Sequence, residues 1–253
     1  MALLETEGLT MKFGGLTAVA DLNLALEKNE IVGLIGPNGA GKTTAFNVIT
    51  GMNRPTSGHV RYRGEELTGL PRHEVTRRGL ARTFQNIRLF KELSVLENVL
   101  VGCHLAINPN VLGATLHLPL YQRRDREARA FALDLLRMVG LEGEAGELAV
   151  NLPYGKQRRL EIVRALATRP TLLLLDEPAA GMNPQESLEL MHFIRKIRDQ
   201  FDLTILLIEH HMQIVMGICQ RMYVLDYGLT IAQGDPAAIQ KDPKVIEAYL
   251  GVG

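Results

Sequence analysis

The chain has 253 residues, of which 46% are hydrophobic and 22% charged, and its 28 basic and 28 acidic residues give a net charge of zero. This composition is typical of a globular protein with a sizeable core, and the balanced charge argues against a protein that coats DNA or RNA. The two cysteines, Cys103 and Cys219, are far apart in sequence, so neither a disulfide framework nor a zinc module is expected. No apolar run reaches the roughly 18 residues of a membrane span, and the first residues lack the basic flank of a signal peptide.

The first third of the chain predicts strands around one helix. Alternating apolar residues separated by turns indicate antiparallel strands, and a continuous apolar run indicates a buried strand. In chain order we expect antiparallel strands at 3–9 and 18–26 around a turn at 14–15, a buried strand at 30–35, a helix at 43–50 closed by Gly51, and a strand at 59–62.

The middle of the chain changes to a helical pattern. Apolar residues recur at helical spacing from about 94 to 140, with a break at 107–119 that contains two prolines and a glycine. The last hundred residues then alternate between helices and continuous apolar strands, which predicts a parallel sheet covered on both faces. The expected helices there are 154–168, 185–200, 213–218 and 243–250, and the expected strands are 172–175, 203–208, 222–226 and 230–233.

The segment after the 30–35 strand matches the phosphate-binding pattern G-x-x-x-x-G-K-[ST] without deviation. Its glycines allow backbone N–H groups to approach a phosphate, and the helix that follows adds a partial positive charge at its N-terminus. Lys42 is expected to bridge the β- and γ-phosphates, and the Thr43 hydroxyl to ligate Mg²⁺. The predicted nucleotide ligands in this loop are Gly36, Asn38, Gly39, Ala40, Gly41, Lys42, Thr43 and Thr44.

Two carboxylates stand at the end of the predicted 172–175 strand. Asp176 and Glu177 follow the apolar run directly, where an α/β sheet places its ligand groups. Alone, they are ordinary solvated acids; beside a phosphate loop, Asp176 is expected to hold Mg²⁺ through water. Glu177 is expected to polarise the attacking water, a role whose removal costs about 10²–10⁴ in rate.

Together these motifs resemble the nucleotide-binding subunits of ABC transporters over almost the whole chain. Residues 83–85 are similar to the Q-loop of that family, 152–160 to its signature, 179–184 to its D-loop and 208–211 to the segment with its switch histidine. The resemblance implies a single α/β domain over 1–253 with a P-loop (RecA-like) core, a mostly parallel sheet and an N-terminal antiparallel β subdomain. We expect the core at 1–86 and 153–236, an inserted helical subdomain at 87–152 and a helical tail at 237–253.

The resemblance also implies roles for individual residues. Phe13 should stack on adenine, Gln85 should contact Mg²⁺ and water, and His210 should reach the γ-phosphate. Tyr154 and Gly155, in the signature, should close over ATP held by the opposite subunit of a head-to-tail dimer. The predicted catalytic residues are Lys42, Gln85, Glu177 and His210, the predicted metal ligands are Thr43, Gln85 and Asp176, and the cofactors are ATP and Mg²⁺.

Two positions depart from the family pattern. Pro153 stands where the signature has serine, and the missing hydrogen bond to phosphate is worth about 1.5–3 kcal/mol. Proline suits the first turn of the following helix, whose N–H groups at Tyr154 and Gly155 can still face an anion. Asn183 stands where the D-loop has aspartate. Either departure, at Pro153 or at Asn183, is consistent with a dimer whose two nucleotide sites differ from each other.

Longer strings narrow the resemblance to the ATPases of high-affinity branched-chain amino-acid importers. The strings are residues 82–90, 154–161, 177–184 and 245–251. This group implies a second ATPase subunit, identical or related, two membrane-spanning permease subunits and, indirectly, a periplasmic binding protein, with no nucleic acid. We expect a peripheral protein on the cytoplasmic face of the inner membrane, soluble when isolated. The alternatives are the ATPase of another ABC system (lipopolysaccharide export, or amide or urea import), a soluble ABC protein of DNA repair or translation and, more remotely, a P-loop phosphotransferase.

Overall fold

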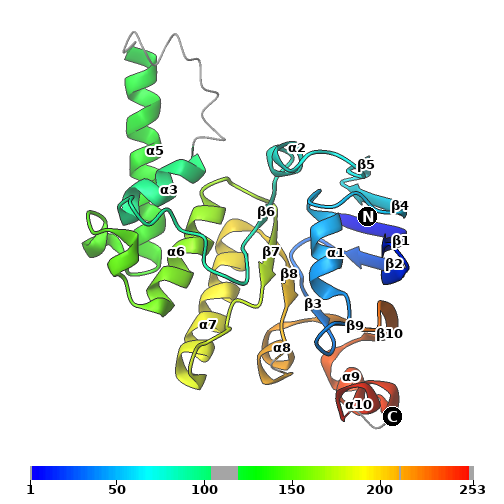
Figure 1. Ribbon diagram of the computed structural model, residues 1–253. Coiled ribbons are helices and arrows are strands. Elements are labelled where there is room, and N and C mark those ends of the chain that lie inside the picture. The colour runs from blue at the N-terminus through cyan, green and yellow to red at the C-terminus, as the bar shows by residue number, and fades with distance from the viewer. Residues whose placement is uncertain (1, 104–118, 211, 251–253) are drawn as a thin grey trace. The chain divides into compact units, whose positions relative to one another are not determined.

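The computed structural model describes residues 2–103, 119–210 and 212–250, and it does not describe the side chains of 119–122 and 213 (Figure 1). Its contacts divide the chain into two compact units, Met1–Arg82 with Thr171–Gly253, and Thr83–Pro170. The second unit extends beyond the helical subdomain expected at 87–152, because the helix that follows the signature packs with the other helices of that unit. The expected helix break at 107–119 lies almost wholly outside the described residues.

The first unit contains two sheets and the helices that cover them. Its strands are β1 (Leu4–Phe13), β2 (Leu16–Leu26), β3 (Ile31–Ile35), β4 (Ser57–Tyr62), β5 (Glu65–Glu66), β6 (Leu80–Arg82), β7 (Leu172–Asp176), β8 (Thr204–Ile208), β9 (Arg221–Asp226) and β10 (Leu229–Gly234). Its helices are α1 (Lys42–Ile49), α2 (Arg72–Arg77), α7 (Pro184–Phe201), α8 (Met212–Ile218), α9 (Pro236–Lys241) and α10 (Pro243–Leu250).

The larger sheet has the order β10-β9-β3-β8-β7-β6. All its neighbouring strands are parallel except the β9–β10 hairpin, which confirms the predicted mostly parallel sheet. Every residue of β3, β7 and β8 is buried, as expected for strands that are covered on both faces. The carboxyl ends of β3 and β7 therefore meet at one edge, where the two phosphate motifs begin.

The smaller sheet, β2-β1-β4-β5, is antiparallel and confirms the N-terminal β subdomain. Helix α1 packs in one apolar cluster with both sheets, because Phe46 and Ile49 share that cluster with residues of β1, β2, β7 and β8. The opposite face of the larger sheet lies against α8, since a Cβ at Gly33 of β3 would meet Val215 and Cys219. Helix α1 thus packs against both sheets, which positions the loop before it.

The second unit is helical. It consists of α3 (Val95–Cys103), α5 (Pro119–Met138), α6 (Tyr154–Leu166) and the short 3-10 turns η1 (Glu142–Glu144) and η2 (Ala149–Asn151). Helix α3 packs closely on α6, where a Cβ at Gly102 would stand 2.4 Å from the Arg164 carbonyl oxygen. The predicted helices are confirmed in both units, and α5 begins at Pro119, the last residue of the expected break.

Four of the described strands and α-helices have no counterpart among the predicted ones. They are the six-residue helix α2, the two-residue strand β5, the three-residue strand β6 and the six-residue helix α9. All four are too short to develop a hydrophobic period, which is the signal used to predict elements from sequence. Of these elements, β6 bears on function, because its last residue, Arg82, lies in the nucleotide site.

No helix in the described part of the chain is long and apolar enough to cross a bilayer. Both cysteines, Cys103 and Cys219, are buried free thiols. Burial raises the pKa of Cys219 to about 12, and the nearby negative charge of Glu209 acts in the same direction. This thiol is therefore a neutral core group at physiological pH.

Asn183 begins α7 with a capping box. Its side chain accepts from the Glu186 N–H at 2.9 Å, and the Glu186 carboxylate accepts from the Asn183 N–H at 2.9 Å. Asn183→Ala should lower the free energy of unfolding by about 1 kcal/mol, as measured by urea denaturation. Asn183→Asp should leave it nearly unchanged, because both side chains accept equally well at this position. Equal losses in the two variants would contradict a capping role.

Candidate functional site

The phosphate loop connects β3 to α1, and its path is set by neighbouring backbone. Gly36 has a φ of 146°, and a Cβ there would stand 2.0 Å from the Leu225 carbonyl oxygen of β9. Gly41 has a φ of 100°, and a Cβ there would stand 2.3 Å from the Ala18 carbonyl oxygen of β2. Only glycine fits either position, so the loop keeps its shape through its packing in the protein.

The N-terminus of α1 is suited to an anion. Gly41 is the N-cap, no described side chain caps the helix, and its first turn carries no acidic residue. The first N–H groups of a helix lack partners within the helix and carry a partial positive charge. Phosphate oxygens supply the missing acceptors, which is why this geometry binds nucleotides.

The Lys42 side chain lies against the same loop. Its Nζ donates to the Gly36 and Pro37 carbonyl oxygens, both at 2.7 Å, and the residue is 6% exposed. Burial lowers the pKa of Lys42, and the negative charges of Glu177 and Asp176 oppose that shift. The two phosphate motifs are also linked by hydrogen bonds, because Arg82 donates both to Asn47 of α1 and to Asp176 of β7, and they therefore form a single site.

The carboxylates lie where β7 ends. Asp176 is 2% exposed, and Glu177 follows it with a φ of 44° and an N–H that donates to the Ile208 carbonyl oxygen at 2.9 Å. The Glu177 Oε2 lies 3.7 Å from His210 Nδ1. The side chain of Glu177 is 14% exposed and that of His210 is 41% exposed, so both can meet water. Lys42, Asp176, Glu177 and His210 thus come together in the first unit.

The donors present fit Mg²⁺. The Asp176 carboxylate and the Thr43 hydroxyl are oxygen ligands, and Thr43 lies in the first turn of α1. Mg²⁺ usually takes one or two protein carboxylates and completes its shell with water and substrate phosphates. The described residues contain no group of three or more His, Cys, Asp or Glu side chains that could hold a metal by themselves. This donor set suits a cation that binds together with a nucleotide.

Two charged residues of this site were not predicted as site residues, although both lie in segments that resemble the family. Arg82 Nη2 donates to Asp176 Oδ2 at 2.7 Å, and both side chains are almost completely buried. Glu209 is fully buried, and its carboxylate accepts from the Ala179 N–H at 3.0 Å and the His210 N–H at 3.2 Å. Their positions next to motif residues were the only sequence clue to either contact.

Phe13 lies at the end of β1, opposite Leu16 in the β1–β2 hairpin. Its side chain is 47% exposed, an unusual state for a large aromatic group and a suitable one for stacking on a base. The same hairpin reaches the phosphate loop, because Ala18 of β2 contacts Gly41. The adenine role of Phe13 stays a prediction.

The second unit contains the other predicted site residues. Pro153 is the N-cap of α6 rather than part of its first turn, and no described side chain caps that helix. Tyr154 and Gly155 are the first residues of α6, so their N–H groups lie at a helix N-terminus that suits an anion. Gln157 supports this turn by donating to the Leu152 carbonyl oxygen at 2.8 Å.

Gln85 lies on the loop after β6, and its backbone is held by Arg158 of α6. Arg158 is fully buried and donates to the carbonyl oxygens of Phe84 at 2.7 Å and Gln85 at 2.5 Å. It also forms an ion pair with Glu161 at 2.8 Å, and Glu161 accepts from the Arg88 N–H at 3.1 Å. The Q-loop and the signature helix are therefore joined by buried, charge-assisted hydrogen bonds.

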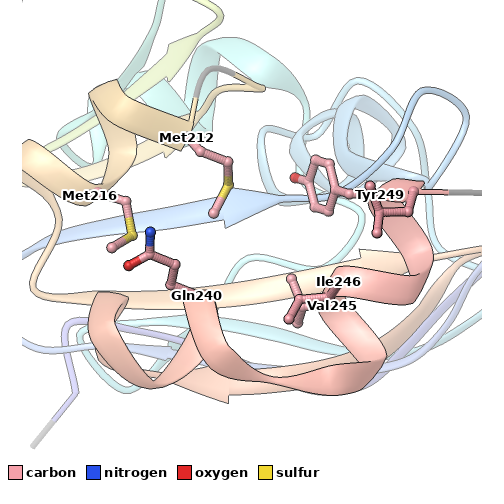
Figure 2. A pocket seen from close by; sticks show the side chains of 7 residues that line it. Met212, Met216, Gln240, Val245, Ile246 and Tyr249 are labelled. Atoms are coloured by element: carbon pink, nitrogen blue, oxygen red, sulfur yellow. The ribbon is translucent and has the colours of Figure 1, made fainter.

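Two hollows lie near the C-terminal helices of the first unit. One, of about 580 Å³, is bordered by the phosphate-loop residues 37–40, by Asp226 and Tyr227, and by Lys244 of α10. The other, of about 430 Å³, lies between α8 and α10 and is lined by Met212, Met216, Gln240, Val245, Ile246, Tyr249 and Leu250 (Figure 2). None of these seven side chains is charged, so the second hollow does not suit a nucleotide.

Together, the uncapped helix after β3, the buried lysine and the two carboxylates after β7 define a P-loop nucleotide-binding protein. The model of the ABC transporter family matches residues 19–180, and that of the branched-chain amino acid ATP-binding cassette transporters matches residues 230–253. The chain belongs to the ABC transporter family and is an ATP-binding cassette ATPase.

Curated relatives cover nearly the whole chain. It is 49% identical, over 98% of both chains, to the high-affinity branched-chain amino acid transport ATP-binding proteins BraF of Pseudomonas aeruginosa and LivG of Escherichia coli. It is 36% identical, over 98% of this chain and 97% of the relative, to the lipopolysaccharide export system ATP-binding protein LptB of Acidithiobacillus ferridurans.

Solved structures agree with the fold. The ADP conformation of MJ1267, an ATP-binding cassette of an ABC transporter, superimposes with a TM-score of 0.87 at 31% identity over 99% of both chains. A dimeric post-hydrolysis state of the cassette MJ0796 bound to ADP and phosphate gives a TM-score of 0.76 at 25% identity, over 92% of this chain and 98% of the other.

Proposed function

We propose that this chain is the ATP-hydrolysing subunit that powers import of branched-chain amino acids. The observation that carries the ATPase part is the geometry of the site: α1, which begins at Lys42, is linked through Arg82 to Asp176 at the end of β7, and Glu177 follows Asp176. The transported substrate is supported by the 49% identity to BraF and LivG and by the C-terminal match over residues 230–253. The lower identity to the lipopolysaccharide export protein disfavours that alternative.

In the proposed reaction, water attacks the γ-phosphorus of ATP and the bond between that phosphorus and the bridging oxygen of ADP breaks. Glu177 accepts a proton from the water, since its partly exposed carboxylate lies beside His210. Lys42 leaves the loop carbonyl oxygens for the β- and γ-phosphates, while the N-terminus of α1 holds the phosphate oxygens. Asp176 and Thr43 would hold Mg²⁺, which would supply charge neutralisation for the phosphates. The role of Gln85 stays a prediction.

Two such subunits, identical or related, work as a dimer in this proposal. The uncapped N-terminus of α6, with Tyr154 and Gly155, contacts the ATP bound by the partner subunit. ATP favours the closed dimer and ADP the open one, and this difference in affinity drives the cycle. The helical unit passes the movement to two membrane-spanning permease subunits at the cytoplasmic face of the membrane, and a periplasmic binding protein delivers the amino acid.

Labelled leucine uptake tests the proposal. Cells that lack this chain should lose high-affinity uptake, and the wild-type chain should restore it while Lys42→Ala should not, because this variant lacks the cation that grips the phosphates. Unchanged uptake in the deletion strain would overturn the amino-acid substrate and direct the search to amides, urea or lipid export. Full rescue by Lys42→Ala would overturn the requirement for ATP at this site.

A further inference from the structure

Arg82 connects three elements of the nucleotide site. It is the last residue of β6, its Nη2 donates to Asp176 Oδ2 of β7 at 2.7 Å, and its Nη1 donates to Asn47 Oδ1 of α1 at 2.7 Å. Nη1 also lies 3.3 Å from Thr50 Oγ1, and the guanidinium carbon lies 5.5 Å from the centre of the Phe46 ring. The side chain is only 7% exposed, so these contacts are desolvated.

The pair with Asp176 determines how that carboxylate can be used. A planar guanidinium with several donors holds an oxygen in a defined direction, whereas a lysine ammonium acts as a point charge. Because Arg82 occupies Oδ2, the carboxylate is left with Oδ1 and the second lone pair of Oδ2 for other partners. The hydrogen bond to Asn47 fixes the guanidinium in turn, which orients Asp176 relative to α1.

We propose that Arg82 is a positioning residue that aims the Asp176 carboxylate at the magnesium position. The inference rests on the proposed role of Asp176 as a Mg²⁺ ligand. Among the described residues, Lys42 is another cation whose charge interacts with Asp176, and it has to serve the phosphates. The ion pair between Arg82 and Asp176 leaves Lys42 available for that role.

Coulomb repulsion alone and the orientation of Asp176 predict opposite effects of removing Arg82 on Mg²⁺ binding. A cation next to a metal site repels the metal, so removal of Arg82 should strengthen Mg²⁺ binding if only Coulomb forces mattered. A hydrogen-bond partner that orients a ligating carboxylate usually affects metal affinity more than this repulsion does. Loss of such a partner typically lowers metal affinity by about 10–100-fold. We expect orientation to dominate, because the pair is buried and held from both sides.

The test measures the affinity of the full-length chain for a fluorescent ADP, in EDTA and across a Mg²⁺ titration. Arg82→Met should keep the affinity in EDTA within about twofold, which shows an intact phosphate loop, and should lower the Mg²⁺ affinity of the complex by about 10–100-fold. Arg82→Lys should recover part of this loss, since an ammonium can meet Asp176 but cannot span to Asn47 as well. Arg61→Met, which removes a partly exposed arginine paired with Glu7, is the matched control and should behave as wild type.

The variant Asp176→Asn distinguishes the proposed metal role of Asp176 from the proposed positioning role of Arg82. If this variant keeps the wild-type Mg²⁺ affinity, the proposed metal role of Asp176 fails, and the inference about Arg82 fails with it. If Asp176→Asn loses Mg²⁺ affinity while Arg82→Met keeps or gains it, the metal role stands and Arg82 is not a positioning residue. Loss in both variants, with partial recovery in Arg82→Lys, supports the proposal.

Discussion

Glu177→Gln should lower kcat for ATP hydrolysis by about 10²–10⁴ and leave ATP binding intact. Glutamine has the shape of glutamate but cannot accept a proton from the attacking water, whereas Lys42 and α1, which hold the phosphates, are unchanged. Phosphate release measures the rate, and size-exclusion chromatography with ATP and Mg²⁺ should show a dimer that accumulates because the bound ATP persists.

An exposed acid of the first unit provides the control for this variant. Glu74→Gln removes a carboxylate that pairs with Arg77 on the surface of α2, and it should hydrolyse ATP at the wild-type rate. Rapid hydrolysis by Glu177→Gln would remove Glu177 from the role of general base. In that case His210, which lies 3.7 Å from Glu177, would be the next residue to test, with His210→Ala.

Arg158→Met should destabilise the protein by about 3–5 kcal/mol, because it leaves the buried Glu161 carboxylate without its ion-paired partner and two Q-loop carbonyl groups without this donor. Burial raises the pKa of Glu161 above its usual value, and the Arg88 N–H and the charges of Arg158 and Arg164 oppose that shift. Without Arg158 the pKa rises further, so the folded state binds more protons than the unfolded state. The stability loss should therefore be larger at pH 8 than at pH 5.

Urea denaturation at the two pH values checks this expectation. Arg137→Met removes an arginine that pairs with Glu142 and Asp134 on the surface of the same unit, and its effect should be too small to resolve. The double change Arg158→Met with Glu161→Leu should recover part of the stability, since no buried carboxylate remains unpaired. A loss with Arg158→Met that is independent of pH would show that Glu161 keeps its charge through another partner.

The sequence predicted the larger elements well because their patterns extend over many residues. The apolar runs that became β3, β7 and β8 are short and bounded by turn residues, which favours buried strands, and the match at 36–43 placed the loop between β3 and α1. The boundary of the helical unit was harder to predict, because α6 follows a motif of the nucleotide site while its side chains pack on α3.

The missed contacts of the site share a physical cause. Arg82 ends a strand of three residues, and Glu209 follows a strand directly, so no periodicity indicates which way either side chain turns. Their partners, Asp176 and Ala179, are far away in sequence and come close only when parallel strands assemble side by side. Pairings of this kind belong to the tertiary structure, and no local pattern contains them.

The buried carboxylate of Glu209 has a mechanical consequence. It holds the N–H of Ala179, where the segment similar to the D-loop begins, and the N–H of His210, which should sense the γ-phosphate. Neither segment can shift far unless one hydrogen bond breaks, and the group left unpaired would cost about 1–3 kcal/mol in the interior. Loss of the terminal phosphate at one nucleotide would therefore be transmitted as displacement to residues 179–184, with the Glu209 carboxylate as one of the links.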